Sequence, residues 1–395
     1  MKDARRRSPP IAADWVQALE HGLHRHWQLG RNMILSWCAW GGGIEVLAVR
    51  HYRAVTFAAT HSTLSRDEAA LVGDPSLAGR AAGDVFRDLI AGSRRLAPER
   101  LHGVARLLQA EPIRIPLARP GLAERAAAEI DKMVARFSIG YVPYRAVVLF
   151  DIVGFSLLEP FEQASQLNSL AYSLNSAHSK LMQSEIDVNF ARSTTGDGFY
   201  VWNRDTGMHA NANLYHFMHV VLADNAIARQ KAQGNTTPLL RTGFDVGDAY
   251  EFYQAEGLNP TVYNYIVGAV TIELARIVDQ ALPGQVLVGD FAVDLPGGTG
   301  KVDSVGFING LQDSLSKLRG MTLSDEQIRD IKCYLTGAPK PGGAFAIHRY
   351  RITDKHGTSR NVFNAKINIY RSGGEPIFLG IQDRDLGGFE RVDSL

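Results

Sequence analysis

The stretch VVLFDIVGFS, residues 147–156, decides the fold of this chain. Together with Ala146 it gives five apolar residues without a polar break, then Asp151, then two more apolar residues and a Gly-Phe-Ser turn. A continuous apolar run of this length, bounded by a turn, is typical of a strand that is buried on both faces. A carboxylate inside such a strand is costly unless a positive charge meets it. The stretch therefore predicts a buried strand that ends where Asp151 meets a cation.

The composition is that of a soluble globular protein with two or three domains. The chain has 395 residues, of which 45% are hydrophobic and 21% charged, and its formal net charge is +1. A charge this close to neutral argues against nucleic acid or an acidic membrane as partner. No apolar run reaches the ~20 residues of a membrane helix, and the basic start lacks the apolar core of a secretory signal. The two cysteines, Cys38 and Cys333, make neither a disulfide framework nor a metal site, so we expect a cytoplasmic protein.

The composition changes near residue 131. The residues before it contain 17 Arg, one Lys and one Asn, and after it Lys and Asn become common. Two interpretations of residues 1–132 stay open. One is an Ala/Arg-rich extension, helical in segments such as 121–137 or else disordered. The other is GC-rich sequence translated upstream of a start at Met133, which would be no part of the native protein. Mass spectrometry of the natively expressed protein separates the two, and neither assigns chemistry to this segment.

Strands and helices alternate between residues 141 and 298, which predicts an α+β domain. The strand at 144–153 is followed by a helix at 160–181. Strands at 188–193 and 199–203 then flank TTGDG, residues 194–198, a hairpin signal with glycines around an aspartate. The pattern continues with a helix at 208–233, a strand at 240–246, a short strand at 263–267, a helix at 269–281 and a strand at 285–288.

The remainder of the chain predicts a linker and a small terminal domain. Residues 299–340 are expected to form a helical linker that ends in a Pro-Lys-Pro-Gly-Gly run. Residues 341–395 contain AFAIHRYRI, AKINIY and PIFLG, whose alternation is typical of a small antiparallel β-rich unit.

Asp151 and Asp197 stand 46 residues apart, the first in the buried strand and the second at the hairpin tip. If those elements are neighbours in one sheet, the two carboxylates converge. A pair of carboxylates with few other ligands suits Mg²⁺, which keeps waters or substrate phosphates in its remaining positions. An isolated aspartate is more often a turn or cap residue, but both of these stand beside glycines that let backbone approach a ligand closely.

Residues 144–290 resemble the catalytic domain of the class III nucleotidyl cyclases, the adenylate and guanylate cyclases. The resemblance lies in several motifs in order: FDIVGFS (150–156), TTGDGF (194–199), RTGFDVG (241–247), YIVGAVTIELAR (265–276) and PGQVLVG (283–289). It implies a ferredoxin-like fold over residues 141–298, with a mixed, mainly antiparallel sheet flanked by helices. It also implies attack of a ribose 3′-hydroxyl on the α-phosphate of a nucleoside triphosphate, with pyrophosphate leaving.

The resemblance assigns expected roles by position. Asp151 and Asp197 match the carboxylates that hold two Mg²⁺ or Mn²⁺ ions per site. Residues 152–155 (Ile152, Val153, Gly154 and Phe155) match the turn whose backbone amides bind the triphosphate. Arg276 matches the arginine that stabilises charge on the phosphorus. Because the family works as a head-to-tail dimer, we expect a homodimer with composite sites.

The positions that read the base depart from the family pattern. Adenylate cyclases have Lys and guanylate cyclases Glu four residues before the second metal aspartate, where this chain has Ser193. The partner position, Asp or Cys in those classes, is Tyr265, or Asn264 if the register shifts by one residue. A bulky tyrosine would fill part of a purine-sized pocket, which favours a pyrimidine. The family's ribose-binding asparagine, four residues before Arg276, is Ile272 here.

Among relatives that lack the purine-reading pair, the chain most resembles the pyrimidine cyclases of the bacterial Pycsar anti-phage systems. Residues 352–370, ITDKHGTSRNVFNAKINIY, also resemble the small sensor domain of some defence cyclases. The resemblance implies conversion of UTP to cyclic UMP, a second messenger for a downstream cyclic-nucleotide-responsive effector. Three alternatives stay open: a cytidylate cyclase, a purine cyclase, and an inactive homologue that binds nucleotide as a regulator.

Overall fold

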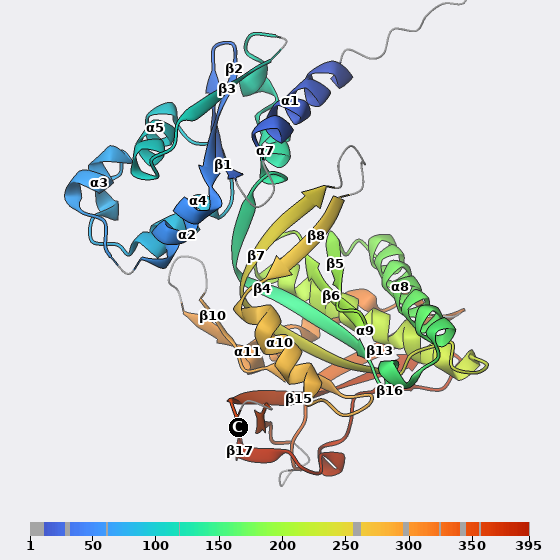
Figure 1. Cartoon of the computed structure of the whole chain (residues 1–395). Coiled ribbons are helices and arrows are strands. Elements are labelled where there is room, and N and C mark those ends of the chain that lie inside the picture. Colours follow the sequence, from blue (N-terminus) through green and yellow to red (C-terminus); the bar gives the residue numbers. More distant parts are fainter. Residues whose placement is uncertain are drawn as a thin grey trace, which may run out of the picture. The chain divides into compact units, whose positions relative to one another are not determined.

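The computed structural model describes residues 12–27, 32–60, 62–117, 119–255, 262–294, 300–323, 325–339, 345–354 and 357–394. Every helix within these ranges is too short or too polar to cross a bilayer. The chain divides into two compact units, Met1–Val142 with Tyr250–Tyr265, and Pro143–Ala249 with Ile266–Leu395. Figure 1 shows their elements, and each unit is described by itself.

The first unit is built on an antiparallel sheet of β1 (Asn32–Trp40), β2 (Gly43–Arg50) and β3 (Pro112–Pro116). Alternate side chains of β1 enter two cores, Met33 and Leu35 on one face and Ile34 and Trp37 on the other. The helices around the sheet are α1 (Ala12–His26), α2 (His51–Ala59), α3 (Arg66–Leu71), α4 (Ala82–Ile90), α5 (Pro98–Leu107), α6 (Leu122–Arg125) and α7 (Ala127–Ala135).

The described part of residues 1–132 is therefore folded, in contrast to the disordered extension considered from the sequence. Trp37, Leu47 and Leu101 are fully buried. Its core is drawn from seven helices and three short strands that the Ala/Arg-rich composition concealed. Residues 1–11 lie outside the described residues, and whether the native protein includes this segment stays a question for mass spectrometry.

The second unit contains a large mixed sheet, which confirms the predicted α+β class. Its main path runs β12-β13-β15-β9-β7-β4-β6-β5, with antiparallel neighbours such as β4 and β6 and a parallel pair, β7 and β9. The elements of the first part are β4 (Ile139–Ile152), α8 (Pro160–Gln183), β5 (Phe190–Thr194), β6 (Gly198–Asn203), α9 (Met208–Lys231), β7 (Leu240–Ala255), β8 (Val262–Val267), α10 (Ala269–Asp279) and β9 (Val286–Gly289). The ends of the helices and hairpin strands predicted for this part agree with the observed bounds to within two residues.

The side chains of β4 separate the two faces of this sheet. Val148 and Phe150 pack in the core formed with α8 and α9, whereas Val147 and Leu149 pack in the core formed with α10. Figure 1 shows α10 and the pair α8 and α9 on opposite sides of β4. By the two-residue alternation of a strand, Asp151 lies on the α10 face.

The C-terminal residues continue the same sheet, so the predicted linker and terminal domain differ from what is observed. In the described part of residues 299–340, the α-helices are α11 (Ser304–Gly310) and α12 (Gln312–Leu315), a 3-10 turn follows at Ser316–Leu318, and then come the strands β12 (Thr322–Leu323) and β13 (Glu326–Leu335). Ile331, Cys333 and Leu335 are buried at every second position, which is the period of a strand and contradicts the predicted helix. The predicted β-rich character is found in β14 (His348–Thr353), β15 (Ser359–Arg371), β16 (Ile377–Leu379) and β17 (Glu390–Ser394). β15 pairs with both β13 and β9; residues 340–344 of the predicted boundary lie outside the described residues.

Candidate active site

The fold brings Asp151 and Asp197 to adjacent positions at one end of the sheet. Asp151 pairs directly with Gly198 across β4 and β6, and Asp197 is the residue before that glycine. The carbonyl of Asp197 accepts the Ile152 amide at 3.0 Å, which ties the hairpin tip to the end of β4. Asp197 also accepts a 3.0 Å hydrogen bond from Thr195 Oγ1 to its Oδ1. The two strands are therefore neighbours, as the predicted convergence of the two carboxylates requires.

Asp151 is buried and meets a cation of the protein itself. The side chain of Arg241, at the start of β7, donates from Nε to Asp151 Oδ2 at 2.5 Å. Burial raises the pKa of Asp151, and the charge of Asp197 adds to the increase, while Arg241 opposes it. One guanidinium thus only partly offsets two carboxylates and the loss of water, so the site favours additional positive charge.

The turn after Asp151 offers two of its four expected amides. The Ile152 amide donates to Asp197, and the Val153 amide donates to the Leu239 carbonyl at 2.9 Å. Gly154 has a φ of 70° and begins a short 3-10 turn. The amides of Gly154 and Phe155 have no acceptor in the described part of the chain, so they are the ones left to bind an anion.

The carboxylate pair fits a divalent cation of the Mg²⁺ type. No cluster of three or more His, Cys, Asp or Glu side chains suited to a metal occurs in the described ranges. Asp151 shares Oδ2 with Arg241, and its Oδ1 has no partner among the described residues. Two carboxylates that each keep an oxygen available as a ligand suit an ion that takes its other ligands from water and substrate phosphates.

Tyr200 links the carboxylates to helix α10. Its hydroxyl donates to the Thr271 carbonyl at 3.0 Å, near the start of α10. Burial raises the pKa of this hydroxyl, and the charges of Asp151 and Asp197 raise it further. Tyr200 therefore stays protonated and fixes α10 against β6 beside the two carboxylates.

Arg276 lies on α10 but is paired elsewhere within the chain. Its Nε lies 3.4 Å from Asp354 Oδ2, and its Nη1 lies 3.7 Å from Glu273 Oε1. Arg360 of β15 binds the same two carboxylates, so two arginines and two acids form one network. The Arg276 side chain is still 37% exposed, and the structure does not bring it to Asp151 or Asp197 of the same chain.

The expected base-reading residues fall in both units. Ser193 is half-buried on β5 and faces Tyr200 across the hairpin. Tyr265 is half-buried on β8 and stacks on Phe252, with ring centroids 5.1 Å apart and planes at 10°. Asn264 precedes it and is also half-buried. Asn264 and Tyr265 belong to the first unit and Ser193 to the second, so each is described within its own unit.

Two residues of the site were not assigned roles from the sequence. Arg241 opens the motif RTGFDVG, and Tyr200 directly follows TTGDGF. The sequence carried part of the signal for Arg241, because a carboxylate in a buried strand predicts a positive charge beside Asp151. That answer required knowing that β7 is the strand hydrogen-bonded beside β4.

Comparisons with known proteins give partial and distant similarities. No protein-family model and no curated protein matches the chain. Among solved structures, the adenylyl cyclase CyaB from P. aeruginosa is 16% identical with a TM-score of 0.34, covering 63% of this chain and 100% of that one. The guanylate cyclase domain of RhGC from Catenaria anguillulae, in complex with GTP, is 13% identical with a TM-score of 0.30, covering 41% and 94%. The guanylyl cyclase Cya2 is 13% identical with a TM-score of 0.28, covering 57% and 92%. These values are too low to support a function, which must come from the side chains described above.

Proposed function

We propose that this chain is a nucleotidyl cyclase that converts a nucleoside triphosphate, UTP in preference, into the 3′,5′-cyclic nucleotide and pyrophosphate. One observation carries the proposal. Two carboxylates 46 residues apart meet beside a turn with unused backbone amides, and Arg241 neutralises them only in part. Such a site is suited to a divalent cation together with a polyphosphate.

In this proposal the aspartates bind the metal ions and the backbone amides bind the phosphates. Asp151 and Asp197 would hold two Mg²⁺ or Mn²⁺ ions, which, when bound, lower the pKa of the attacking 3′-hydroxyl and neutralise the polyphosphate. The amides of Gly154 and Phe155 would donate to phosphate oxygens without adding side-chain bulk. Arg241 holds the Asp151 carboxylate in place through its Nε. Its position beside that carboxylate also puts a positive charge near the phosphates.

A second copy of the chain would complete each site. Arg276 is partly exposed on α10 and, within the described residues, is paired with Glu273 and Asp354 and not with Asp151 or Asp197. A head-to-tail homodimer would bring it to the phosphates bound by its partner, where an arginine is worth about 10³-fold or more in rate. Arg276 would have to leave Glu273 and Asp354 to reach the substrate. Breaking this ion-pair network would therefore be a step in forming the active dimer.

The preference for a pyrimidine rests on Ser193 and Tyr265. Ser193 offers one short hydroxyl, and Tyr265 is held by its stack on Phe252. A tyrosine fixed in this way takes up room that a purine would need, and Asn264 is the alternative reader. Cytosine is served equally well by a serine hydroxyl. The role in anti-phage defence, with a cyclic-nucleotide-responsive effector, is supported by the sequence resemblance to the Pycsar cyclases alone.

An inactive, nucleotide-binding regulator is the second candidate, and two observations favour it. Ile272 is 53% exposed at the position where the resemblance expects a ribose-binding asparagine. Arg276 is engaged by two acids. Against this stands the position of half-buried Asp197 beside buried Asp151, because keeping two neighbouring carboxylates with only one arginine between them carries a cost in folding free energy.

The deciding experiment incubates the full chain with ATP, GTP, CTP and UTP separately in the presence of Mn²⁺, followed by chromatography of the products. Cyclic UMP as the main product supports the leading proposal, and cyclic AMP or cyclic GMP refutes the pyrimidine preference. Absence of any product, with nucleotide binding retained in equilibrium dialysis, establishes the regulator. Asp151→Asn and Asp197→Asn should each abolish turnover. Asp313→Asn, an exposed aspartate on α12 outside the site, is the matched control and should leave it unchanged.

A further inference from the structure

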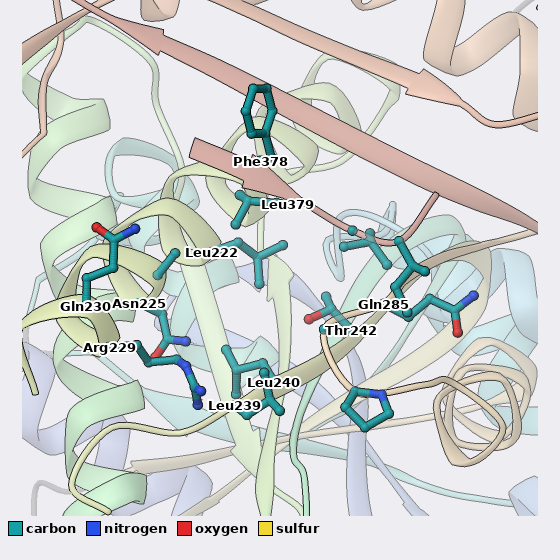
Figure 2. Close-up of a pocket in the computed structure, with 16 residues that line it drawn as sticks. Leu222, Asn225, Arg229, Gln230, Leu239, Leu240, Thr242, Gln285, Phe378 and Leu379 are labelled. Atoms are coloured by element: carbon teal, nitrogen blue, oxygen red, sulfur yellow. The ribbon is translucent and has the colours of Figure 1, made fainter. Parts of the chain in front are cut away.

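A cavity of about 440 Å³ opens on the face of the sheet opposite Asp151. Its walls come from the C-terminal half of α9, the start of β7, the turn before β9, and β16 (Figure 2). Leu240 belongs to the core on the α9 side, whereas Arg241 points to Asp151 on the α10 side. The cavity and the candidate active site therefore share one strand segment but lie on its two faces.

The lining combines an apolar wall with unsatisfied polar groups. Leu222, Leu240 and Leu379 supply apolar surface (Figure 2). Asn225 and Thr242 are 4% and 1% exposed; Asn225 Nδ2 donates to the Pro238 carbonyl at 3.0 Å, but neither Asn225 Oδ1 nor Thr242 Oγ1 has a hydrogen-bond partner among the described residues. Buried polar atoms are normally paired, so two orphans in one cavity wall point to a ligand that pairs them.

The charge of the cavity is positive. Arg229, on the last turn of α9, is the charged residue of the lining, and no Asp or Glu contributes to it within the described residues. Figure 2 shows its side chain between Asn225 and Leu240. No ion pair of Arg229 occurs in the described part of the chain. Arg229 is exposed at the edge of the cavity, where a guanidinium without a counter-charge can pair with a carboxylate or a similar anion, weakened by solvent screening.

The shared strand gives the cavity a physical connection to the phosphate turn. The carbonyl of Leu239, which lines the cavity, accepts the Val153 amide at 2.9 Å. The Leu240 carbonyl accepts the Gly284 amide at 2.9 Å, also from the lining. A molecule that immobilises residues 239–242 would therefore also restrain the anchor of the turn after Asp151.

We propose that this cavity binds a small organic acid with an apolar body and a hydrogen-bond donor, such as a hydroxylated aryl carboxylate. The carboxylate pairs with Arg229, the apolar body lies on the leucine wall, and the donor meets Asn225 Oδ1. Binding restrains residues 239–242 and, through the Leu239 carbonyl, the Val153 amide. This site goes beyond the proposed cyclase activity, and its test does not require turnover.

The test uses 3-hydroxybenzoate as probe, with 3-hydroxybenzyl alcohol as the uncharged counterpart, titrated into the full chain by calorimetry. We expect the acid to bind in the millimolar range or tighter, and the alcohol at least about five-fold more weakly. Arg229→Gln should weaken binding of the acid by about five-fold and remove the preference over the alcohol. Arg329→Gln, an exposed arginine on β13 outside the cavity, removes the same charge and should leave binding unchanged.

Two further measurements separate this site from nonspecific binding. Ala226→Phe projects a ring into the cavity from α9 and should abolish binding of both probes, with circular dichroism checking the fold. Hydrogen–deuterium exchange of a peptide containing Val153 should slow when the acid is bound. No binding to the wild type, or equal binding to the wild type and Arg229→Gln, would overturn the proposal. If Ala226→Phe fails to fold, the comparison between the two arginine variants still decides it.

Discussion

The position of Gly198 gives a prediction that can be worked out from the structure. Gly198 faces Asp151 across β4 and β6. A Cβ added there would lie 2.0 Å from the Phe150 carbonyl oxygen and 3.1 Å from the Asp151 Cα. The closest ordinary carbon–oxygen contacts are about 3.3 Å, so Gly198→Ala forces the two strands apart by roughly 1.3 Å at the pair that brings the carboxylates together.

That displacement should be expensive in both stability and activity. Overpacking that moves backbone costs up to about 3 kcal/mol, and here it also strains the strand pair that continues through Phe150 and Phe199. A 1 Å misplacement of reacting groups lowers rates by about 10²-fold. We therefore expect Gly198→Ala to lose about 3 kcal/mol in the free energy of unfolding and about 10²-fold in the turnover of the proposed cyclase reaction.

The same hairpin supplies the control. Gly196 has a φ of +104° and nothing within 4 Å of an added Cβ, so Gly196→Ala meets backbone strain but no clash and should cost about 1 kcal/mol. Both variants are compared with the wild type by urea denaturation, with fluorescence as the probe because Trp202 lies on β6. If Gly198→Ala is no less stable than Gly196→Ala, the strands are not as close as described and the reasoning fails.

Three further predictions concern buried carboxylates. Burial raises the pKa of Asp151, so its ionised form opposes folding. Asp151→Asn should therefore have a larger free energy of unfolding than the wild type at pH 7, and this difference should shrink as the pH falls toward 4. Denaturation at several pH values measures it. Burial likewise raises the pKa of Asp245 to about 7, so its protonated form favours the folded state. As the pH rises from about 4 to 7, the free energy of unfolding of the wild type should fall by up to about 1.4 kcal/mol per pH unit relative to that of Asp245→Asn. Plots of unfolding free energy against pH that run parallel for the two proteins would contradict this. Asp354 is 5% exposed and binds Arg276 and Arg360; Asp354→Asn should lower stability by about 2 kcal/mol in thermal or urea unfolding, and an unchanged midpoint would show that the network contributes nothing.

The sequence predicted the centre of the second unit well because local pattern and tertiary role agree there. The apolar run before Asp151 is typical of a buried strand, and the glycines around Asp197 favour a tight turn between two strands. The observed hairpin, with Thr195 donating from its amide to the Gly198 carbonyl at 3.0 Å, follows from those residues. Two carboxylates on such elements meet if the strands are neighbours, and they are.

The pairing of strands that are far apart in the sequence could not be predicted from the sequence. Nothing local to Arg241 indicates that β7 is hydrogen-bonded beside β4, so its ion pair with Asp151 was not predicted. Residues 326–335 carry Arg, Asp and Lys between buried apolar positions, which resembles an amphipathic helix until β15 is known to cover one edge. The first unit was missed for a similar reason, since its short strands β1 to β3 gain their apolar partners only in the folded sheet.

Because its sheet is continuous, the second unit cannot be divided at residue 298 without breaking strand pairs. β9 is held between β7 and β15, so a protein shortened at residue 298 would present the outer edge of β9, with unpaired amides and carbonyls, to any other strand in solution. Such a fragment should aggregate and should not show the proposed activity. Because of the same strand pairing, a structural change in the C-terminal strands can act on the candidate site without a hinge or linker. It reaches β7, and with it Arg241, across two rows of hydrogen bonds.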